Sequence, residues 1–250
     1  NKAHGNGGAI YMKIVDNILI NHTIVTNNTA GRQGVAVYCD IAKFIKSSFS
    51  CSFSTFANNT YTGSGRLACG GAFYVKIWGS ILFLNTEFNN NIGCDGAAMP
   101  IDTRSRHTTD QPRHAVGIHV IRFKLLTFKS CIFTSNMQSA IFAEMGKYIY
   151  LEGCLFVKNK NLIIVNKEKS MRAIHRTEVF IINTIFVQNN ATLTQNLIWF
   201  NFVSAIWLIK CKMEANIGTC IYINSRWGQT RSTIIKMIFT KNRSLRATAI

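Results

Sequence analysis

The stretch Leu151–Asn159 reads LEGCLFVKN, and in it a large apolar residue, Phe156, stands three positions before an asparagine, Asn159. The same spacing occurs eight times, and the sequence separations between successive asparagines are 31, 32, 45, 23, 30, 27 and 26. Internal repeats on this scale are typical of a solenoid or a propeller, in which each repeat is one unit of an array. The eight pairs are Val25 and Asn28, Phe56 and Asn59, Phe88 and Asn91, Phe133 and Asn136, Phe156 and Asn159, Phe186 and Asn189, Met213 and Asn216, and Phe239 and Asn242.

Three further columns of residues accompany the motif. Two positions before the large apolar residue the chain has Thr23, Ser54, Thr86, Cys131, Cys154, Thr184, Cys211 and Met237. Five positions before it stand Ile20, Cys51, Phe83, Phe128, Leu151, Ile181, Leu208 and Ile234, and seven before it Ile18, Phe49, Ile81, Leu126, Ile149, Val179, Ile206 and Ser232. A spacing of two predicts strands whose alternate side chains point to one face. The columns seven and five positions before the large apolar residue are an even number of residues apart, whereas the column two positions before it is an odd number away from both. This change of parity predicts a bend, a bulge or a corner between two strands.

A second element with a small apolar residue precedes each of these segments. Its most regular forms are GGAIY, from Gly7 to Tyr11, and GGAFY, from Gly70 to Tyr74. Small side chains at one level of every repeat predict a narrow, closely packed interior. The column consists of Ala9, Ala36, Ala72, Ala98, Ala140, Ile163, Ile198, Cys220 and Ala249.

The shortest repeats decide between the two architectures. They run from Asn196 to Gly218 and from Gln138 to Asn161. Each therefore has the length of one turn of a parallel β-helix, whereas a propeller blade needs ~40–50 residues. We predict an all-β, right-handed parallel β-helix of about eight coils, with residues 1–250 as one domain. Each motif asparagine is expected at a corner, where it can adopt left-handed backbone angles and stack into an amide ladder.

The pairing of GGAI-like strands with large-apolar-x-x-Asn turns resembles the repeats of the polymorphic membrane proteins of chlamydiae. More loosely, it resembles the pectin-lyase-like β-helix superfamily. The resemblance covers the whole chain, although the strict GGA form occurs only at Gly7–Ala9 and Gly70–Ala72. It implies a right-handed β-helix at a cell surface that serves as an adhesin or a structural stalk.

The charge of the chain points to acidic partners. Net charge is +17, from 28 Lys and Arg against 11 Asp and Glu. Many basic residues fall in the variable stretches between strands, which a stacked rod would bring to one edge. Such an edge would attract acidic glycans, anionic lipid, nucleic acid or an acidic protein, although loops are also simply where charge is solvated. No nucleic-acid-binding fold accompanies the charge, so nucleic acid is not favoured. The candidate binding residues are Arg104, Arg106, His107, Arg113, His114, Lys167, Lys169, Arg172 and Arg176.

The cysteines and the N-x-S/T sequons are candidate modification sites. Two pairs among the 8 cysteines are candidate disulfides: Cys131 with Cys154, which share a column in adjacent repeats, and Cys69 with Cys94. Alternatively, the cysteines are small interior side chains. None has the spacing of a metal site, so no metal or cofactor is expected. Sequons for N-glycosylation occur at Asn21, Asn27, Asn58, Asn190 and Asn242.

Catalysis is not favoured, because the few carboxylates form no compact motif. Glycoside hydrolysis usually needs a carboxylate pair, and the nearest pairing across repeats is Asp16 with Asp40. A lyase site would need Asp95, Asp102 or Asp110 beside an arginine, at unspecific spacing. We predict a non-enzymatic structural or adhesive rod, extracellular or at the cell surface, that contacts acidic glycan or a protein partner. The alternative is a carbohydrate-binding or polysaccharide-cleaving β-helix.

The two ends of the chain both consist of repeat sequence, starting by Gly7 and stopping at Ile250. We therefore expect a segment of a longer protein, able to self-assemble through its ends, because open strand edges template pairing with another chain. No apolar run is long enough for a transmembrane helix, so no transmembrane segment is predicted.

Overall fold

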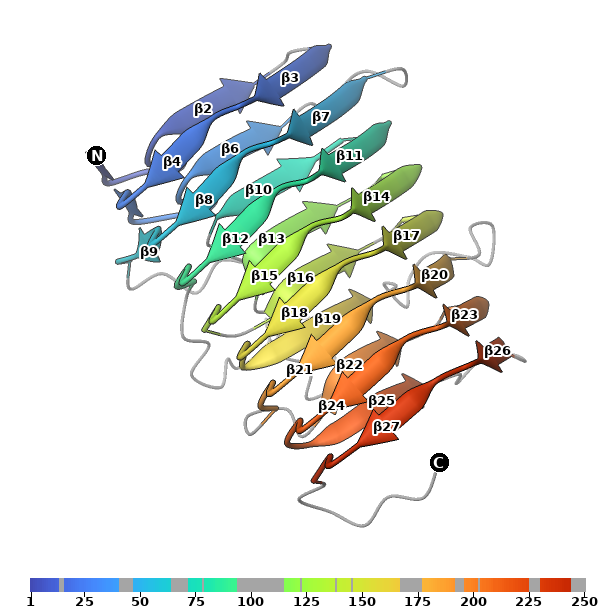
Figure 1. The fold of residues 1–250 in the computed structure, drawn as a ribbon. Helices are drawn as coiled ribbons and strands as arrows, with labels where there is room; N and C mark the ends of the chain where they lie inside the picture. Colours follow the sequence, from blue (N-terminus) through green and yellow to red (C-terminus); the bar gives the residue numbers. More distant parts are fainter. Residues whose placement is uncertain are drawn as a thin grey trace, which may run out of the picture.

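The computed structural model describes residues 1–13, 16–40, 47–63, 72–77, 79–93, 115–121, 123–137, 139–144, 146–166, 177–191, 196–201, 203–224 and 230–243. Every regular element in these ranges is a β-strand, and the strands stack in parallel along one axis (Figure 1). The same ranges contain no helix that is long and apolar enough to cross a membrane.

Three eight-stranded parallel sheets and one short three-stranded sheet make up the described fold. The first sheet contains β2 (Ile10–Lys13), β6 (Val37–Asp40), β10 (Phe73–Lys76), β13 (Ala115–Ile121), β16 (Ser139–Glu144), β19 (Asn161–Asn166), β22 (Asn196–Asn201) and β25 (Thr219–Asn224). The second contains β3 (Asn17–Asn21), β7 (Ser48–Ser52), β11 (Ser80–Leu84), β14 (Leu125–Lys129), β17 (Tyr148–Glu152), β20 (Glu178–Ile182), β23 (Ala205–Ile209) and β26 (Arg231–Ile235). The third contains β4 (Ile24–Thr26), β8 (Thr55–Ala57), β12 (Glu87–Asn89), β15 (Ile132–Thr134), β18 (Leu155–Val157), β21 (Ile185–Val187), β24 (Lys212–Glu214) and β27 (Ile238–Thr240). The short sheet contains β1 (Lys2–Ala3), β5 (Thr29–Ala30) and β9 (Thr60–Tyr61).

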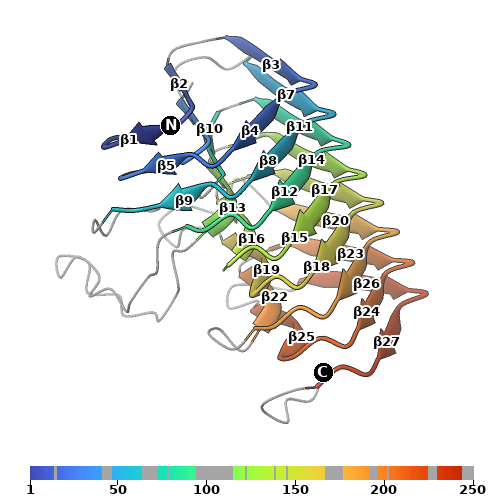
Figure 2. The same cartoon turned by 60° about the vertical axis from the view of Figure 1, so that its left-hand side comes forward.

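One strand from each large sheet makes one coil, and we number the coils 1 to 8 from β2–β3–β4 to β25–β26–β27. The predicted parallel β-helix is therefore confirmed, with the expected number of coils. Figure 2 shows the chain turning sharply at the end of each second-sheet strand, so that the second and third sheets meet along an edge of the rod.

The aromatic residues of the repeat motif form the spine of the core. Phe88, Phe133, Phe156 and Phe186 are register partners in successive strands of the third sheet. Their ring centroids are 4.9, 4.6 and 5.0 Å apart, with nearly parallel planes. From the first sheet, Phe73 packs edge-on against this spine and against the second sheet, so one interior is shared by all three sheets.

The small-residue column lines the same interior where the structure describes it. Ala36, Ala72 and Ala140 are fully buried. The expectation was wrong for Ile163 and Ile198, because both are in register with Ile141, one position after Ala140. Ala9 is exposed in coil 1, whose strand β2 has a neighbour on one side only among the described residues. Ala98 and Ala249 lie outside the described residues.

Left-handed residues make the predicted change of parity between the second and third sheets. One such residue follows each second-sheet strand, with φ between 46° and 63°. A side chain disfavours this conformation, yet only one of the eight is glycine, so coil stacking must hold the others in it. The eight corner residues are His22, Phe53, Asn85, Ser130, Gly153, Asn183, Lys210 and Lys236.

A second left-handed corner follows each third-sheet strand, and here one expectation was wrong. The residue with positive φ is the one before the motif asparagine, not the asparagine itself. The asparagine comes next and turns its amide into the interior, where hydrogen bonding rather than backbone conformation selects it. The eight corner residues are Asn27, Asn58, Asn90, Ser135, Lys158, Gln188, Ala215 and Lys241.

The predicted amide ladder is present and continuous. Each motif asparagine donates from Nδ2 to the Oδ1 of the next, over 2.9–3.2 Å, from Asn28 through Asn242. The same Oδ1 also accepts from the neighbour's backbone N–H, as when Asn136 donates to Asn159 over 3.0 Å. From Asn59 onward, the second Nδ2 hydrogen goes to the carbonyl of the large apolar motif residue one coil back, as when Asn159 donates to Phe133 over 2.9 Å. Asn1 donates to Asn28 in the same way, so the ladder also includes a residue that the motif search missed.

Shortening a side chain of the aromatic spine should destabilise the coil stack. Phe156→Ala removes a fully buried ring that stacks on a ring at each face, and we expect unfolding to become easier by roughly 3–5 kcal/mol. Lys13→Ala, at an exposed position of β2, is the matched control and should change stability by less than ~0.5 kcal/mol. Urea denaturation of both variants measures this, and equal losses would contradict the assignment of inward and outward positions.

Breaking the amide ladder should also be costly. Asn159→Ala leaves the Phe133 carbonyl and the donors of Asn136 without this partner inside the protein, while the Oδ1 of Asn189 keeps only the backbone N–H of residue 159. An unsatisfied buried group costs ~1–3 kcal/mol, so we expect a loss of at least ~3 kcal/mol in the free energy of unfolding. Asn17→Ala, at an exposed strand position, is the control. A loss no greater than that of the control would show that the ladder does not stabilise the coils.

Candidate functional site

The basic residues predicted to bind a partner cannot be placed. Residues 94–114 and 167–176 lie outside the described part of the chain, and all nine candidates fall there. They are Arg104, Arg106, His107, Arg113, His114, Lys167, Lys169, Arg172 and Arg176. Cys69 and Cys94 lie outside it as well, as do Asp95, Asp102 and Asp110.

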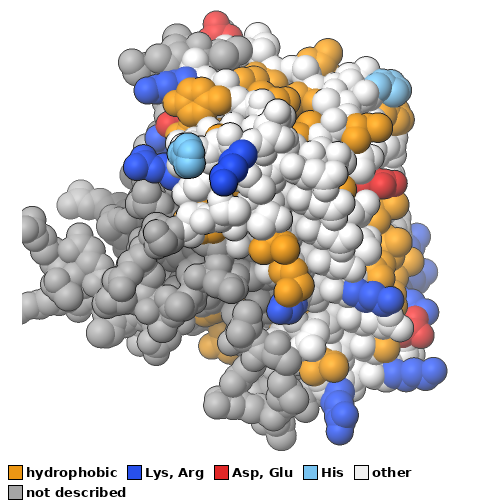
Figure 3. Space-filling model, turned by 90° about the vertical axis from the view of Figure 1, so that its left-hand side faces the viewer, with side chains coloured by type: hydrophobic (Ala, Val, Ile, Leu, Met, Phe, Trp, Pro, Cys, Tyr) orange, Lys and Arg blue, Asp and Glu red, His pale blue; other side chains and the backbone are white. Residues whose placement is uncertain are grey.

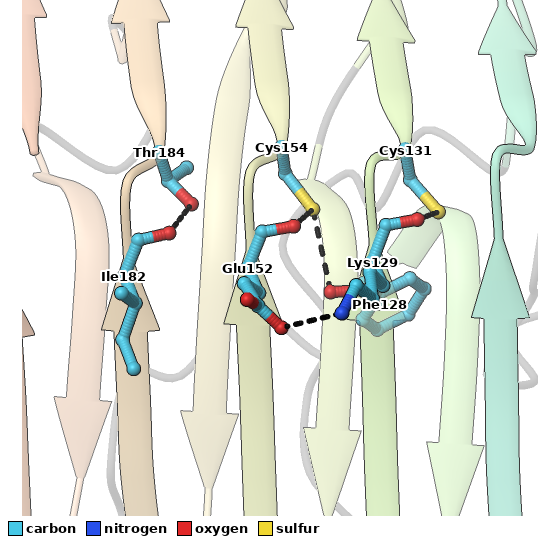
Figure 4. Close-up of polar contacts among 7 residues, drawn as sticks. All are labelled: Phe128, Lys129, Cys131, Glu152, Cys154, Ile182 and Thr184. Carbon is cyan, nitrogen blue, oxygen red and sulfur yellow. Dashed lines mark hydrogen bonds and ion pairs between the residues drawn. The ribbon is translucent and has the colours of Figure 1, made fainter.

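A column of hydroxyl and thiol groups lies at the corner between the second and third sheets (Figure 4). Each member follows the left-handed corner residue and donates to the carbonyl two positions earlier. Thr184 Oγ1 donates to Ile182 over 3.0 Å, and Cys154 Sγ donates to Glu152 over 3.6 Å. In coil 4, which precedes the coil of Cys154, Cys131 Sγ donates to Lys129 over 3.4 Å.

Several members of the column also donate to the coil before. Cys131 Sγ reaches the Phe83 carbonyl over 3.4 Å, and Cys154 Sγ reaches that of Phe128 over 3.5 Å. Thr86 Oγ1 does the same to Cys51 over 3.3 Å. Thiol and hydroxyl thus serve one purpose here, which is to tie a tight corner to its own strand and to the previous coil. The sequence carried this signal in the alternation of Thr, Ser and Cys two positions before the aromatic residue.

Cys131 and Cys154 lie in adjacent coils, and both are free thiols. The structure therefore has two hydrogen-bonding thiols where the sequence allowed a disulfide. Interaction with the Cys154 side chain and burial raise the pKa of the Cys131 thiol above its ordinary value. Both side chains are almost completely buried, which agrees with the alternative that these cysteines are interior side chains.

The other described cysteines are also protected from ionisation. Burial raises the pKa of Cys39 to about 12, with a further contribution from Asp40. Burial raises the pKa of Cys51 and of Cys220 to about 11. Since the thiolate is the reactive form, these positions are poorly suited to nucleophilic chemistry near neutral pH.

Three of the described carboxylates are paired with lysines, and the described carboxylates do not converge. Asp40 contacts Lys76 at 3.4 Å, Glu152 contacts Lys129 at 3.3 Å, and Glu214 contacts Lys212 at 2.6 Å. The Lys212 hydrogen bond lowers the pKa of the exposed Glu214 carboxyl. Within the described ranges, no group of three or more His, Cys, Asp or Glu side chains could hold a metal ion.

Two aromatic stacks lie on outward faces of the sheets, and the motif search did not identify them. On the first sheet, Tyr11, Tyr38 and Tyr74 stack with ring centroids 5.0 and 5.1 Å apart. Burial, and then the nearby Asp40 carboxylate, raise the pKa of Tyr38 to about 12, so its phenol stays protonated. The only sequence signal was the recurrence of an aromatic residue at one strand position.

The second stack lies on the second sheet and consists of Tyr150, Phe180 and Trp207. Their ring centroids are 4.5 and 4.2 Å apart, and the planes differ by 1–2°. Because the rings cover each other's faces, mainly their edges are left toward solvent. Sugar rings stack on aromatic faces, and the middle ring of each stack has both faces covered, whereas Tyr11, at the end of the first stack, is 54% exposed.

The side of the rod seen in Figure 3 is largely polar or backbone. Hydrophobic side chains lie along one edge of that view together with Lys and Arg, others lie at its top and centre, and few Asp or Glu are visible.

The sequons differ in how available their amides are. Asn27 and Asn58 are exposed at the corner before the ladder, and Asn21 is exposed at the end of β3, where its Oδ1 accepts from Ser52. Asn190 is partly buried in a bridge to Ile217. Asn242 belongs to the ladder, and its Nδ2 donates to Met213 over 2.8 Å.

Comparison of the chain with protein-family models, with curated proteins and with solved structures finds no match in any of the three.

A hydroxyl should replace the thiol of Cys131 without loss. Thr occupies the same column position at Thr86 and Thr184, so Cys131→Thr should keep the corner hydrogen bonds and stay within ~1 kcal/mol of the wild type. Cys131→Val has nearly the same shape as the threonine variant but no donor, and it should lose ~0.5–1.5 kcal/mol relative to it. Urea denaturation compares the pair. A valine variant as stable as the threonine variant would show that the thiol acts only by packing.

The exposed sequons should be glycosylated selectively in a secretory host. When the chain is secreted from animal cells, we expect glycan at Asn27 or Asn58 and none at Asn242, whose amide is held in the ladder. Peptide mass spectrometry before and after enzymatic deglycosylation measures occupancy. The double variant Asn27→Gln, Asn58→Gln should lose glycan and Asn242→Gln should not. Glycan at Asn242 would mean that the ladder opens at that end.

Proposed function

We propose that this protein is a non-enzymatic structural or adhesive rod, extracellular or at a cell surface, that binds an acidic glycan or an acidic protein along its side. The proposal rests on one observation, which is that the polar groups of the interior form hydrogen bonds between coils. The amides of the ladder and the thiols and hydroxyls of the corner are all engaged in joining one coil to the next. The polar groups of the interior therefore stabilise the stack of coils, and only the outer faces are available to bind a partner.

The charge balance supports an acidic partner. The chain has 28 basic and 11 acidic residues, and Asp40, Glu152 and Glu214 are already neutralised by lysines of the same molecule. The excess positive charge is thus available to molecules in solution. A rigid rod with regularly spaced basic side chains suits an extended anionic chain, because coil spacing of ~4.8 Å sets a regular distance between charges.

The surface location follows from the resemblance to cell-surface β-helix repeats and from the sequons. The exposed amides of Asn21, Asn27 and Asn58 are compatible with a secreted glycoprotein. Association through the ends of the rod belongs to the same proposal.

A binding assay combined with a cleavage assay tests the proposal. The chain is titrated with heparin and with polygalacturonate in a calorimeter, with neutral dextran as the control. We expect both acidic glycans to bind, more weakly as salt rises from ~0.1 M to ~1 M, because the Debye length falls from ~10 Å to ~3 Å.

Each polysaccharide is then incubated with the protein and examined for new reducing ends and unsaturated uronate. We expect neither product. Cleavage of either polysaccharide would favour the alternative, a polysaccharide lyase or hydrolase. Failure to bind any acidic glycan would leave only an acidic protein as the lateral partner, which crosslinking on intact cells would then have to capture.

A further inference from the structure

We propose that the outer surface of coils 5 to 7, on the second and third sheets, is a docking face for an anionic lipid bilayer. We call this surface the lateral apolar face. It is built by β17, β20 and β23 on the second sheet and by β18, β21 and β24 on the third, which lie side by side in Figures 1 and 2. Its apolar side chains are Tyr150, Phe180, Trp207, Ile182, Ile209 and Ile185.

Hydrophobic residues occupy outward strand positions here, which are ordinarily polar. Ile182 and Ile209 are partly exposed at the ends of β20 and β23, and Ile185 on β21 is 40% exposed. In coils 1 and 2 the positions equivalent to Ile182 hold Asn21 and Ser52 instead. Core packing does not require these apolar side chains, because the inward residues of the same strands are already fully buried. A contiguous apolar surface of this kind marks an interaction site.

The backbone beneath this face is compatible with an apolar environment. Strands β17, β20 and β23 each pair with a neighbour on both sides, so their N–H and C=O groups are engaged in the sheet. Contact with lipid is unfavourable for unpaired backbone groups, and the interior coils present none on this sheet. In the described part of the chain, the edge strands β3 and β26 of this sheet lack this property.

Lysines stand at corners within and beside the lateral apolar face. Lys158 and Lys210 occupy the two left-handed corners in coils 5 and 7, and Lys236 follows Lys210 in the next coil. All three are exposed and have no ion pair among the described residues. The acidic groups nearby are largely neutralised, Glu152 by Lys129 and Glu214 by Lys212, while Glu178 is unpaired within the described ranges. The net field at this face therefore favours anions.

These properties together select a lipid surface over the other occupants. A second copy would bring the same lysines to the contact and would be repelled. A neutral sugar would find ring edges rather than ring faces, because Tyr150, Phe180 and Trp207 stack on one another. A bilayer with anionic headgroups offers a flat apolar layer with negative charge above it. Tyr and Trp favour this interface, and exposed lysines are attracted to anionic headgroups.

Vesicle sedimentation tests the proposal with the full 250-residue chain. The probes are vesicles of phosphatidylcholine alone and of phosphatidylcholine mixed with phosphatidylserine. We expect sedimentation with the mixed vesicles at ~0.1 M salt, at least tenfold less with phosphatidylcholine alone, and release toward ~1 M salt. Absence of binding to the mixed vesicles would overturn the proposal.

Two charge-reversal variants distinguish binding at this face from attraction by the total positive charge of the chain. The test variant carries Lys158→Glu, Lys210→Glu and Lys236→Glu. The control carries Lys2→Glu, Lys13→Glu and Arg32→Glu, which change the same charge at exposed positions of the first coil. Circular dichroism first establishes that both are folded. The test variant should lose at least tenfold in binding and the control less than threefold. Equal losses would show attraction by total charge, and the lateral apolar face would not be the site.

A fluorescence measurement places the bilayer on the face directly. Brominated lipid in the mixed vesicles should quench the tryptophan emission of the wild type, and the quenching should fall in Trp207→Phe, which keeps the aromatic stack. Quenching that Trp207→Phe leaves unchanged would overturn the proposal. The proposal would also be overturned if soluble poly-L-glutamate displaced the vesicles through the same three lysines and the lipid gave no quenching. The face would then be a site for acidic protein.

Discussion

The hydrogen bond between the amides of successive asparagines is the interaction on which the rest of this structure depends. Parallel strands joined only by backbone hydrogen bonds can slip by one residue, and such a slip would exchange the inward and outward faces. The ladder opposes slippage because each Oδ1 accepts both an amide N–H and a backbone N–H from its neighbour, as in Asn136 and Asn159. The buried position of these amides makes a missing partner costly. Each asparagine therefore holds its coil in register with the next.

Correct register then produces the other columns. The rings of Phe133 and Phe156 stack because their strands pair residue to residue, and the same holds for Phe180 and Trp207 on the outside. Because only the strand segments must be in register from coil to coil, the chain also tolerates repeats of unequal length. The sequence separation between neighbouring ladder asparagines accordingly ranges from 23 to 45. Variation is thereby confined to the connections and the outward positions, which are the places available for recognition.

The thiols illustrate how this architecture uses reactive groups for structure. Cys131 and Cys154 take positions that Thr86 and Thr184 take in neighbouring coils, and they make the same corner hydrogen bonds. A residue that often signals redox chemistry or metal binding is here a short donor that fits a tight corner. Function must then be sought on the outside, where the basic excess and the lateral apolar face distinguish one part of the rod from another.

By itself, the sequence determined the fold, because the pattern that encodes a β-helix is local and repeated. The asparagine motif, the aromatic spine and the change of parity could all be identified from spacing, since each coil meets the same stacking requirement. It did not determine which residue adopts the left-handed backbone angle. Asn159 is not that residue, because its side chain is selected by the hydrogen bonds of the ladder, and the ladder forms only when the coils stack. The use of Cys131 as a donor and the pairing of Glu152 with Lys129 likewise needed the tertiary structure. The apolar outer face of coils 5 to 7 also emerged only there, because side chains that are a whole repeat apart in the sequence become neighbours when the coils stack in register.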